Sequence, residues 1–202
     1  MSKALEMSSL VTNILVWLLR IRLYYGANRQ ETPWRKTPHY QGGFLLDGGV
    51  HFVAATRLLL GESAKPKAVS AFTTLLQKHL PPVDTLNSIW TTTSGISGTF
   101  SVSFGITLSG SEYTVACEKG SVSVVRGTVT VRHGEEKDAK SEVRQFDSEG
   151  SGVAQEVVAW AQGLVDGKTN PKQSPEEALV DLVCIDCIWR HCQAFITCKG
   201  EC

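Results

Sequence analysis

The sequence predicts an α+β domain in which an open, mostly antiparallel β-sheet carries helices packed on one face. Three observations support this class. A nearly all-apolar segment of helical length occupies about 44–60, and short segments that alternate apolar with polar residues fill about 66–146. Apolar residues then recur at helical spacing from residue 153 onward. A helix, a series of strands without helices between them, and further helices are typical of a sheet covered on one face.

Length and charge narrow the class of function. The chain has 202 residues, enough for one sizeable core or at most two small domains. Twenty basic residues balance twenty acidic ones, so no overall field attracts nucleic acid or an anionic membrane. We therefore expect neither nucleic acid nor a membrane as a partner.

Residues 1–31 read as an apolar extension outside the domain. The apolar run from Leu10 to Leu19 is shorter than the roughly 18–20 residues needed to span a bilayer. Lys3 is offset by Glu6, and no small-residue cleavage site follows, so a secretory signal is disfavoured. We predict a helix or a partly ordered segment here and a cytoplasmic protein.

The first element of the domain is a helix from about Phe44 to Leu60. A turn at Gln41-Gly42-Gly43 precedes it, and Gly61 suits its end because glycine readily adopts the left-handed conformation. Apolar residues surround most of its circumference. Such a helix must be covered on two sides, by the sheet and by another element.

The strands follow as an antiparallel meander. In Thr99–Phe104, three apolar side chains face one way and three hydroxyls face the other, as in a half-buried strand. Further strands are expected at 69–76, 85–93, 113–117, 121–125, 128–132 and 142–146. Gly120 and Gly127 mark tight turns. The face rich in Ser and Thr is either solvated or a polar interface with another subunit.

Two helices complete the domain. The first carries an apolar stripe at helical spacing, formed by Val153, Val157, Trp160 and Leu164. The second should run from Pro175 to about His191, since Ser174 and Glu177 form a capping-box pattern around the proline.

Asp47 and His51 are the residues that suggest chemistry. A spacing of four puts both side chains on one face of the expected helix, one turn apart. A carboxylate can orient an imidazole that transfers a proton. The alternative is that Asp47 bonds the helix start and His51 is an ordinary helix histidine.

Six cysteines raise the question of a metal. Cys117 stands alone in a strand and reads as an ordinary buried thiol. The other five crowd the end of the chain, at Cys184, Cys187, Cys192, Cys198 and Cys202. A zinc site would combine Cys184 and Cys187 with Cys192 or His191, but no second well-spaced pair follows. We predict no metal site, and treat residues 187–202 as an atypical tail.

A family resemblance rests on three motifs. They are Trp34-Arg35, then Gly42-Gly43-Phe44-Leu45-Leu46-Asp47-x-Gly49-Val50-His51, then Arg57-Leu58-Leu59-Leu60-Gly61. Glu118-Lys119-Gly120-Ser121 and Ser174–Leu179 fit the same pattern. Residues 32–186 thereby resemble the C-terminal domain of the glucose–fructose oxidoreductase, inositol dehydrogenase and MocA family, and look closest to its fungal NADP-linked members.

The resemblance implies a substrate domain of a two-domain dehydrogenase. In this family an N-terminal Rossmann domain holds NAD or NADP, and the C-terminal domain supplies the substrate site and the oligomer interface. By resemblance, His51 is the acid/base on a hydroxyl of a sugar- or cyclitol-like substrate, and Asp47 orients it or binds the substrate. Trp34 and Arg35 are candidate substrate contacts. A second copy of the chain is the expected partner of the sheet.

The departures from the family are large. The sequence has no Gly-x-Gly-x-x-Gly, the turn that brings a pyrophosphate to a helix N-terminus, and no cofactor-binding residue is identified. It also lacks the family's Glu-Lys-Pro segment. We expect a truncated chain that is catalytically incomplete alone. The alternatives are a non-enzymatic dimerisation or interaction domain derived from the family and a metal protein built on the cysteine tail.

Overall fold

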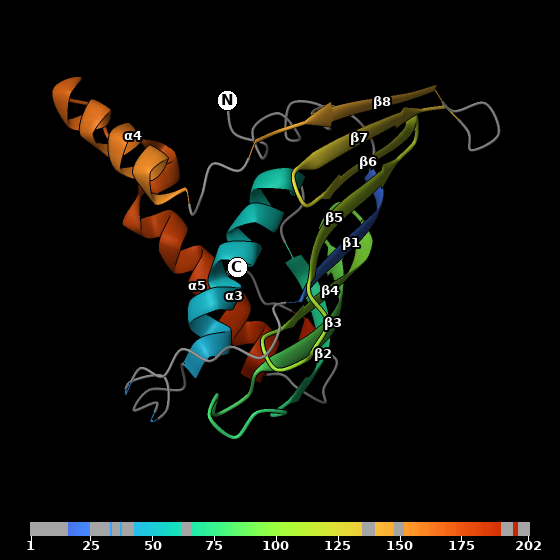
Figure 1. Cartoon of the computed structure of the whole chain (residues 1–202), viewed down its shortest axis with the longest axis vertical. Coiled ribbons are helices and arrows are strands. Elements are labelled where there is room, and N and C mark those ends of the chain that lie inside the picture. The colour runs from blue at the N-terminus through green and yellow to red at the C-terminus, as the bar shows by residue number, and fades with distance from the viewer. Residues whose placement is uncertain are drawn as a thin grey trace.

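An open nine-stranded sheet forms the body of the molecule, and its helices lie on one side (Figure 1). The computed structural model describes residues 16–24, 33, 37, 43–61, 66–134, 140–147, 152–190 and 196–197. Its strands are β1 (Val16–Tyr24), β2 (Pro66–Thr74), β3 (Thr85–Thr92), β4 (Ser97–Ser103), β5 (Gly110–Cys117), β6 (Gly120–Val125), β7 (Thr128–His133), β8 (Lys140–Gln145) and β9 (Ile196–Thr197). Its helices are α3 (Gly43–Leu60), α4 (Val153–Val165), the 3-10 turn η2 (Pro171–Gln173) and α5 (Pro175–Arg190). The predicted α+β class is confirmed.

The centre of the sheet differs from the prediction. The strand order is β8-β7-β6-β5-β1-β4-β3-β2-β9, so β1 lies between β4 and β5. It runs parallel to β4 and antiparallel to β5, whereas the other described pairs are antiparallel. A helix or an extension was therefore the wrong expectation for Val16–Tyr24; residues 1–15 lie outside the described residues.

The pattern of β1 explains its place. Ile21 and Leu23 are fully buried under the helices, while Arg20 and Arg22 alternate with them onto the opposite, outer face. This is the period of two that a half-buried strand requires. Reading the segment as an apolar run that stops at Leu19 hid that alternation, because Arg20 and Arg22 then fall outside the run.

The other predicted strands are confirmed within a few residues of their ends. On the inner face, Phe100 and Val102 of β4 are fully buried, and Phe100 stacks on Trp90 of β3 at a centroid distance of 5.2 Å. The outer face carries the hydroxyls, for example Thr99, which lies opposite the exposed Ile89. The core thus lies between the inner face and the helices.

Helix α3 lies between the sheet and α5, as its all-round apolar surface predicts. A Cβ added at Gly48 would lie 2.6 Å from Cζ of Phe104 on the sheet side. One added at Gly49 would lie 2.5 Å from Cδ1 of Ile185 on α5. Among the described helices only α3 has the length and composition of a bilayer-spanning segment, a test that core helices of soluble proteins also pass.

Ion pairs fix α5 to α3. Arg57 binds Glu177 at 3.0 Å and also binds Asp181. The hydroxyl of Ser174 accepts a hydrogen bond from the Glu177 amide at 3.2 Å, so half of the predicted capping box is present. The reciprocal half is wrong, because the Glu177 carboxylate bonds Arg57 on α3 instead of the start of its own helix.

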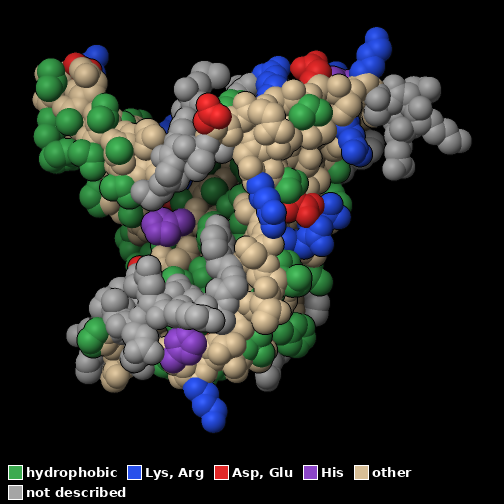
Figure 2. All heavy atoms as spheres, viewed as in Figure 1, with side chains coloured by type: hydrophobic (Ala, Val, Ile, Leu, Met, Phe, Trp, Pro, Cys, Tyr) green, Lys and Arg blue, Asp and Glu red, His purple; other side chains and the backbone are tan. Residues whose placement is uncertain are grey.

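Helix α4 points away from the body, and none of its residues is buried (Figure 1). The segment after it turns back, and the Gln173 side chain donates to the Glu156 carbonyl at 2.9 Å. Figure 2 shows the result as a lobe covered with hydrophobic side chains. The predicted stripe of Val153, Val157, Trp160 and Leu164 exists, but it is more than half exposed.

Candidate active site

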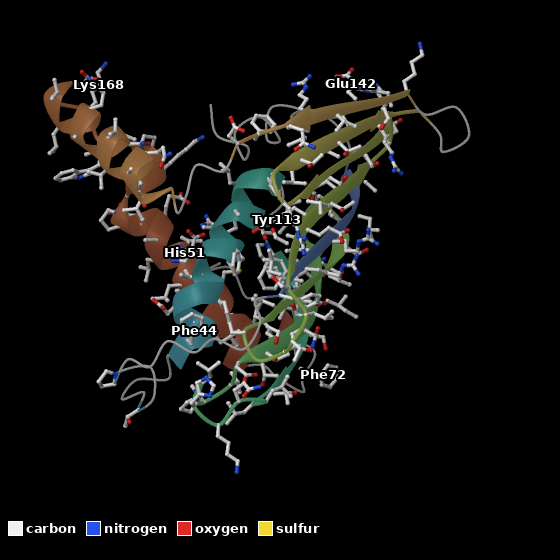
Figure 3. The ribbon with its side chains drawn as sticks, viewed as in Figure 1. Phe44, His51, Phe72, Tyr113, Glu142 and Lys168 are labelled. Atoms are coloured by element: carbon white, nitrogen blue, oxygen red, sulfur yellow. The ribbon has the colours of Figure 1, made fainter. Side chains whose placement is uncertain are left out.

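Asp47 and His51 lie one turn apart in the first half of α3. Asp47 is half-buried and His51 is exposed. In Figure 3, His51 projects from the side of α3 that faces away from the strands. The prediction that one helix carries both residues is thus confirmed, and the helix presents an imidazole at the surface with a carboxylate beside it.

An aromatic floor supports this turn of α3 from the sheet side. Phe104, which follows β4, is buried beneath Gly48, where any side chain would collide with its ring. Phe44 meets the same ring edge-on at a centroid distance of 4.6 Å, and Phe52 lies nearly parallel to it at 6.4 Å. Edge and offset contacts of this kind add about 0.5–1.5 kcal/mol each beyond area burial. The helix segment that carries the pair is therefore firmly seated.

The start of α3 is seated in a second place. Gly43 adopts a φ of 71°, and a Cβ there would run into Pro81 and Pro82 of the turn between β2 and β3. Only glycine accepts both the left-handed backbone and this close approach. Gly43, the second glycine of the Gly42-Gly43 pair in the sequence, therefore allows the start of α3 to pack closely against this turn.

That packing bears on the expected coenzyme. A dinucleotide needs free backbone amides at a helix N-terminus behind a glycine-rich turn. The first residue of α3 is covered by Pro81 and Pro82, and α5 begins with a proline capped by Ser174. Neither of these two helix starts is therefore open to a pyrophosphate.

Two other ionisable groups, Arg57 and Cys117, have pKa values that are shifted by their surroundings in the fold. Burial by itself lowers the pKa of Arg57, but its bonds and ion pairs with Asp181 and Glu177 raise that pKa overall. Burial raises the pKa of the Cys117 thiol, which makes a reactive thiolate unfavourable there. Both groups hold the core together instead of serving the Asp47–His51 site.

No metal cluster occurs within the described ranges, where no three His, Cys, Asp or Glu side chains gather. Cys184 is buried and Cys187 is half-buried, and both lie on α5. Cys192 and His191, the other members of the zinc hypothesis, lie outside the described residues. So do Trp34 and Arg35, and their proposed role in substrate binding stays a prediction.

Two supporting residues were missed by the sequence reading. Phe104 continues the apolar alternation of β4 one residue past the end of the strand. That alternation predicted that Phe104 is buried, which it is, but it did not predict its contact with α3. Asp84 is a buried acid just before β3, and nothing in its local pattern indicates its role. Both act through the tertiary structure, which local spacing does not reveal.

The sequence profile of the oxidoreductase family C-terminal alpha/beta domain matches residues 14–194. The match begins upstream of the boundary at residue 32 drawn from the motifs, and it takes in all of β1. A curated relative, dehydrogenase FPY6 of Fusarium mangiferae, is 39% identical over 167 residues. That alignment covers 79% of this chain but 48% of the relative, so the chain spans about half of its length.

Solved structures agree on the fold. An oxidoreductase from Thermotoga maritima superposes with a TM-score of 0.83 at 26% identity, covering 98% of this chain and 60% of that one. A levoglucosan dehydrogenase solved with NADH and L-sorbose gives 0.76 at 13% identity, covering 96% of this chain and 61% of the other. At that identity the second likeness shows the fold alone.

Proposed function

Because the chain belongs to the oxidoreductase family whose C-terminal alpha/beta domain it matches, we propose that it forms the substrate side of an NAD(P)-dependent oxidoreductase. The reaction would interconvert a hydroxyl and a carbonyl on a sugar- or cyclitol-like molecule. The observation that carries the proposal is the Asp47–His51 pair on one face of α3, with His51 exposed, in a chain that is similar to a dehydrogenase.

The pair supplies proton transfer. When an alcohol carbon is oxidised, the hydroxyl proton must leave as the carbonyl forms, and an imidazole nitrogen of His51 is suited to accept it. Asp47, one turn earlier on the same face, can hold the imidazole in its working orientation or bond a neighbouring hydroxyl. A nicotinamide coenzyme would take the hydride. His51 would return its proton to solvent, to which it is exposed.

The substrate class draws support from the relatives. The Fusarium relative is a dehydrogenase, and one protein of the same fold was solved with NADH and L-sorbose. A polyol-like substrate also suits the exposed imidazole of His51 with a carboxylate one turn away, because its hydroxyls can bond both groups. Since the start of α3 is packed against Pro81 and Pro82 and the start of α5 is capped by Ser174, we propose that these 202 residues need a dinucleotide-binding domain to complete the reaction.

The test joins the chain to the half of the Fusarium dehydrogenase that it does not match. We expect this fusion to bind NADP or NAD and to reduce it in the presence of a sugar or polyol from a panel, followed by nicotinamide absorbance. His51→Ala and Asp47→Asn should each lower turnover on the order of a hundredfold, since a positioned proton-transfer group contributes that much. Saturable coenzyme binding by the unfused chain in calorimetry would contradict its incompleteness.

His133→Ala is the matched control. His133 is an exposed histidine on β7, and its nearest charged partner is Glu142 at 3.4 Å. Its replacement should leave turnover of the fusion unchanged. If His133→Ala and His51→Ala lose turnover equally, or if His51→Ala and Asp47→Asn both keep full turnover, the catalytic roles assigned to His51 and Asp47 are wrong.

A second candidate function is a non-enzymatic dimerisation domain, in which the sheet pairs with another copy. It is favoured by the outer face of the sheet, where hydroxyls surround the exposed Phe72 and Ile89. Uncovered apolar side chains on a flat face are common at interfaces. The same fusion decides between the two: a dimer by sedimentation with no turnover on any substrate favours the interaction domain.

A further inference from the structure

A buried carboxylate lies where the turn between β2 and β3 meets the end of β4. Asp84 is 0% exposed. Its oxygens accept hydrogen bonds from the amides of Leu76 at 3.1 Å and Gln77 at 2.6 Å, and from the Thr85 hydroxyl at 2.9 Å. Burial of a carboxylate is costly unless such donors satisfy it. An acid at this position is therefore retained for the groups that it binds.

The same residue holds the chain that follows β4. The Asp84 amide donates to the Thr74 carbonyl at 3.1 Å, and the Asp84 carbonyl accepts from the Phe104 amide at 2.9 Å. Gly105 lies directly against the carboxylate, where a Cβ would collide with it, and its carbonyl accepts from the Gln77 side chain at 2.8 Å. The backbone of Asp84 thus joins the end of β2 to residue 104, and its carboxylate holds the turn 75–83, whose Gln77 in turn bonds Gly105.

Both segments held by Asp84 reach α3. Phe104 presents its ring beneath Gly48, the residue that follows Asp47 and precedes His51 by three. The turn presents Pro81 and Pro82 to Gly43, the first residue of the helix. The two places where the first half of α3 rests on the sheet side therefore share one anchor.

We propose that Asp84 is a positioning residue for the Asp47–His51 pair. It fixes the turn 75–83 against residues 104–105, so that Phe104 supports Gly48 while Pro81 and Pro82 support Gly43. The height and rotation of the first two turns of α3 follow from these supports. Asp84 itself touches neither substrate nor coenzyme. The value of the positioning for catalysis rests on the proposed function, whereas the positioning itself is geometric.

The chemistry demands a carboxylate in particular. Both of its oxygens accept, and here they face two backbone N–H donors and a hydroxyl. In Asp84→Asn one oxygen becomes an NH2 group, which must face a donor or rotate away. The variant keeps the shape of the side chain but breaks part of the anchor, which makes it a test of position and not only of packing.

The test compares NMR spectra of the 202-residue protein and its variants. Asp84→Asn should shift the Gly48 amide, which senses the Phe104 ring, and the His51 imidazole signals. The control is Ser88→Ala, which removes another buried polar group: Ser88 donates to the Phe100 carbonyl at 3.0 Å and accepts from Trp90 at 2.8 Å. We expect shifts at Gly48 and His51 several times larger in Asp84→Asn than in Ser88→Ala, at comparable losses of stability.

Gln77→Ala keeps the proposal testable if Asp84→Asn fails to fold. It removes only the bond to the Gly105 carbonyl and should shift the Gly48 amide in the same direction by a smaller amount. If Asp84→Asn folds and the Gly48 and His51 signals do not move, the proposal is overturned. If Asp84→Asn does not fold, unmoved signals in Gln77→Ala overturn it in the same way.

A second readout uses the fusion with the dinucleotide-binding half. Asp84→Asn should lower kcat by tenfold to about a hundredfold, because small misplacement of a catalytic group has effects of that order, while coenzyme affinity stays unchanged. Unchanged kcat beside shifted NMR signals would overturn the catalytic part of the proposal. A wild-type fusion without turnover would refute the proposed function, and the NMR comparison would still decide the positioning.

Discussion

Helices α3 and α4 are both rich in apolar side chains, but the fold treats them in opposite ways. Seven residues of α3 are buried, between the sheet and α5. None of the residues of α4 is buried, although its apolar residues recur at cleaner helical spacing. Apolar periodicity therefore shows which face of a helix needs cover, but it does not show what supplies that cover.

The difference follows from the shapes of the two helices. Gly48 and Gly49 bring α3 close to Phe104 on one side and to Ile185 on the other. In α4 the glycine is Gly163, and it faces the returning chain at Lys168 instead of another element. The apolar stripe of α4 is therefore left exposed among the described residues.

The largest expected effect is on the free energy of unfolding, and it comes from the same Leu→Ala substitution made in each of the two helices. Leu59 on α3 is 4% exposed and Leu164 on α4 is 63% exposed. Leu59→Ala should lower the free energy of unfolding by about 2–5 kcal/mol, the cost of a lost core side chain and its cavity. Leu164→Ala should change it by less than about 0.5 kcal/mol. Urea denaturation measures both, and equal losses would mean that α4 is covered in solution.

The outer face of the sheet is a second exposed region. Unlike the apolar stripe of α4, it carries an ion-pair cluster, in which Arg20 and Arg22 of β1 bind Glu112 of β5. Burial by itself raises the pKa of Glu112, but hydrogen bonds from Arg22, Thr114 and Arg20 outweigh this and lower it. The folded pKa lies below the ordinary value of 4.5, so the cluster stabilises the fold above that pH. The contribution is lost as the pH falls through the lowered folded pKa.

Glu112→Gln should accordingly reduce stability near neutral pH, and its difference from the wild type should vanish in acid. The effect should be smaller than that of Leu59→Ala, because Arg20 and Arg22 are about half exposed. Thermal unfolding across a pH series measures it. Glu142→Gln on the exposed strand β8 is the control and should be neutral. A Glu112→Gln deficit that persists or grows in acid would contradict the lowered pKa.

The smallest effect on stability concerns the stripe itself. Val157→Glu should leave the free energy of unfolding within about 0.5 kcal/mol, since Val157 is exposed within the chain. It should reduce any concentration-dependent association in sedimentation, because a charge disfavours burial of that face. Gln155→Glu on the polar side of α4 is the control. A large loss of stability in Val157→Glu alone would show that another part of this chain covers α4.

Local sequence pattern predicts where the helices and strands of this fold lie better than it predicts which elements pack or pair with one another. The alternation in β4 and the apolar circumference of α3 depend on side chains within one segment, so both could be read directly. The place of β1 between β4 and β5 depends on pairing such as Ile21 with Phe100, which no local rule contains. The same limit explains Glu177, whose carboxylate bonds distant Arg57 instead of its own helix start.

The candidate site divides along the same line. The placement of Asp47 and His51 on one face of a helix follows from a spacing of four, and the structure confirms it. Their catalytic roles, and those of Trp34 and Arg35, come from resemblance and stay predictions. The supports of the pair come from segments distant in the sequence. Phe104 packs against Gly48 of α3, and Asp84 holds the backbone of Phe104. Local spacing around Asp47 and His51 contains no sign of either contact.

The insertion of β1 also has a consequence for biosynthesis. Strands β2 to β4 and β5 to β8 can each form from neighbouring hairpins, but in the described sheet β1 joins the two groups, and its partners lie about 80 residues later on β4 and about 90–100 residues later on β5. Contacts of such long range slow folding, because the intervening loop must close first. On the ribosome, β1 is made before both of its partners, so its apolar Ile21 and Leu23 stay without their sheet neighbours until β4 and β5 have emerged.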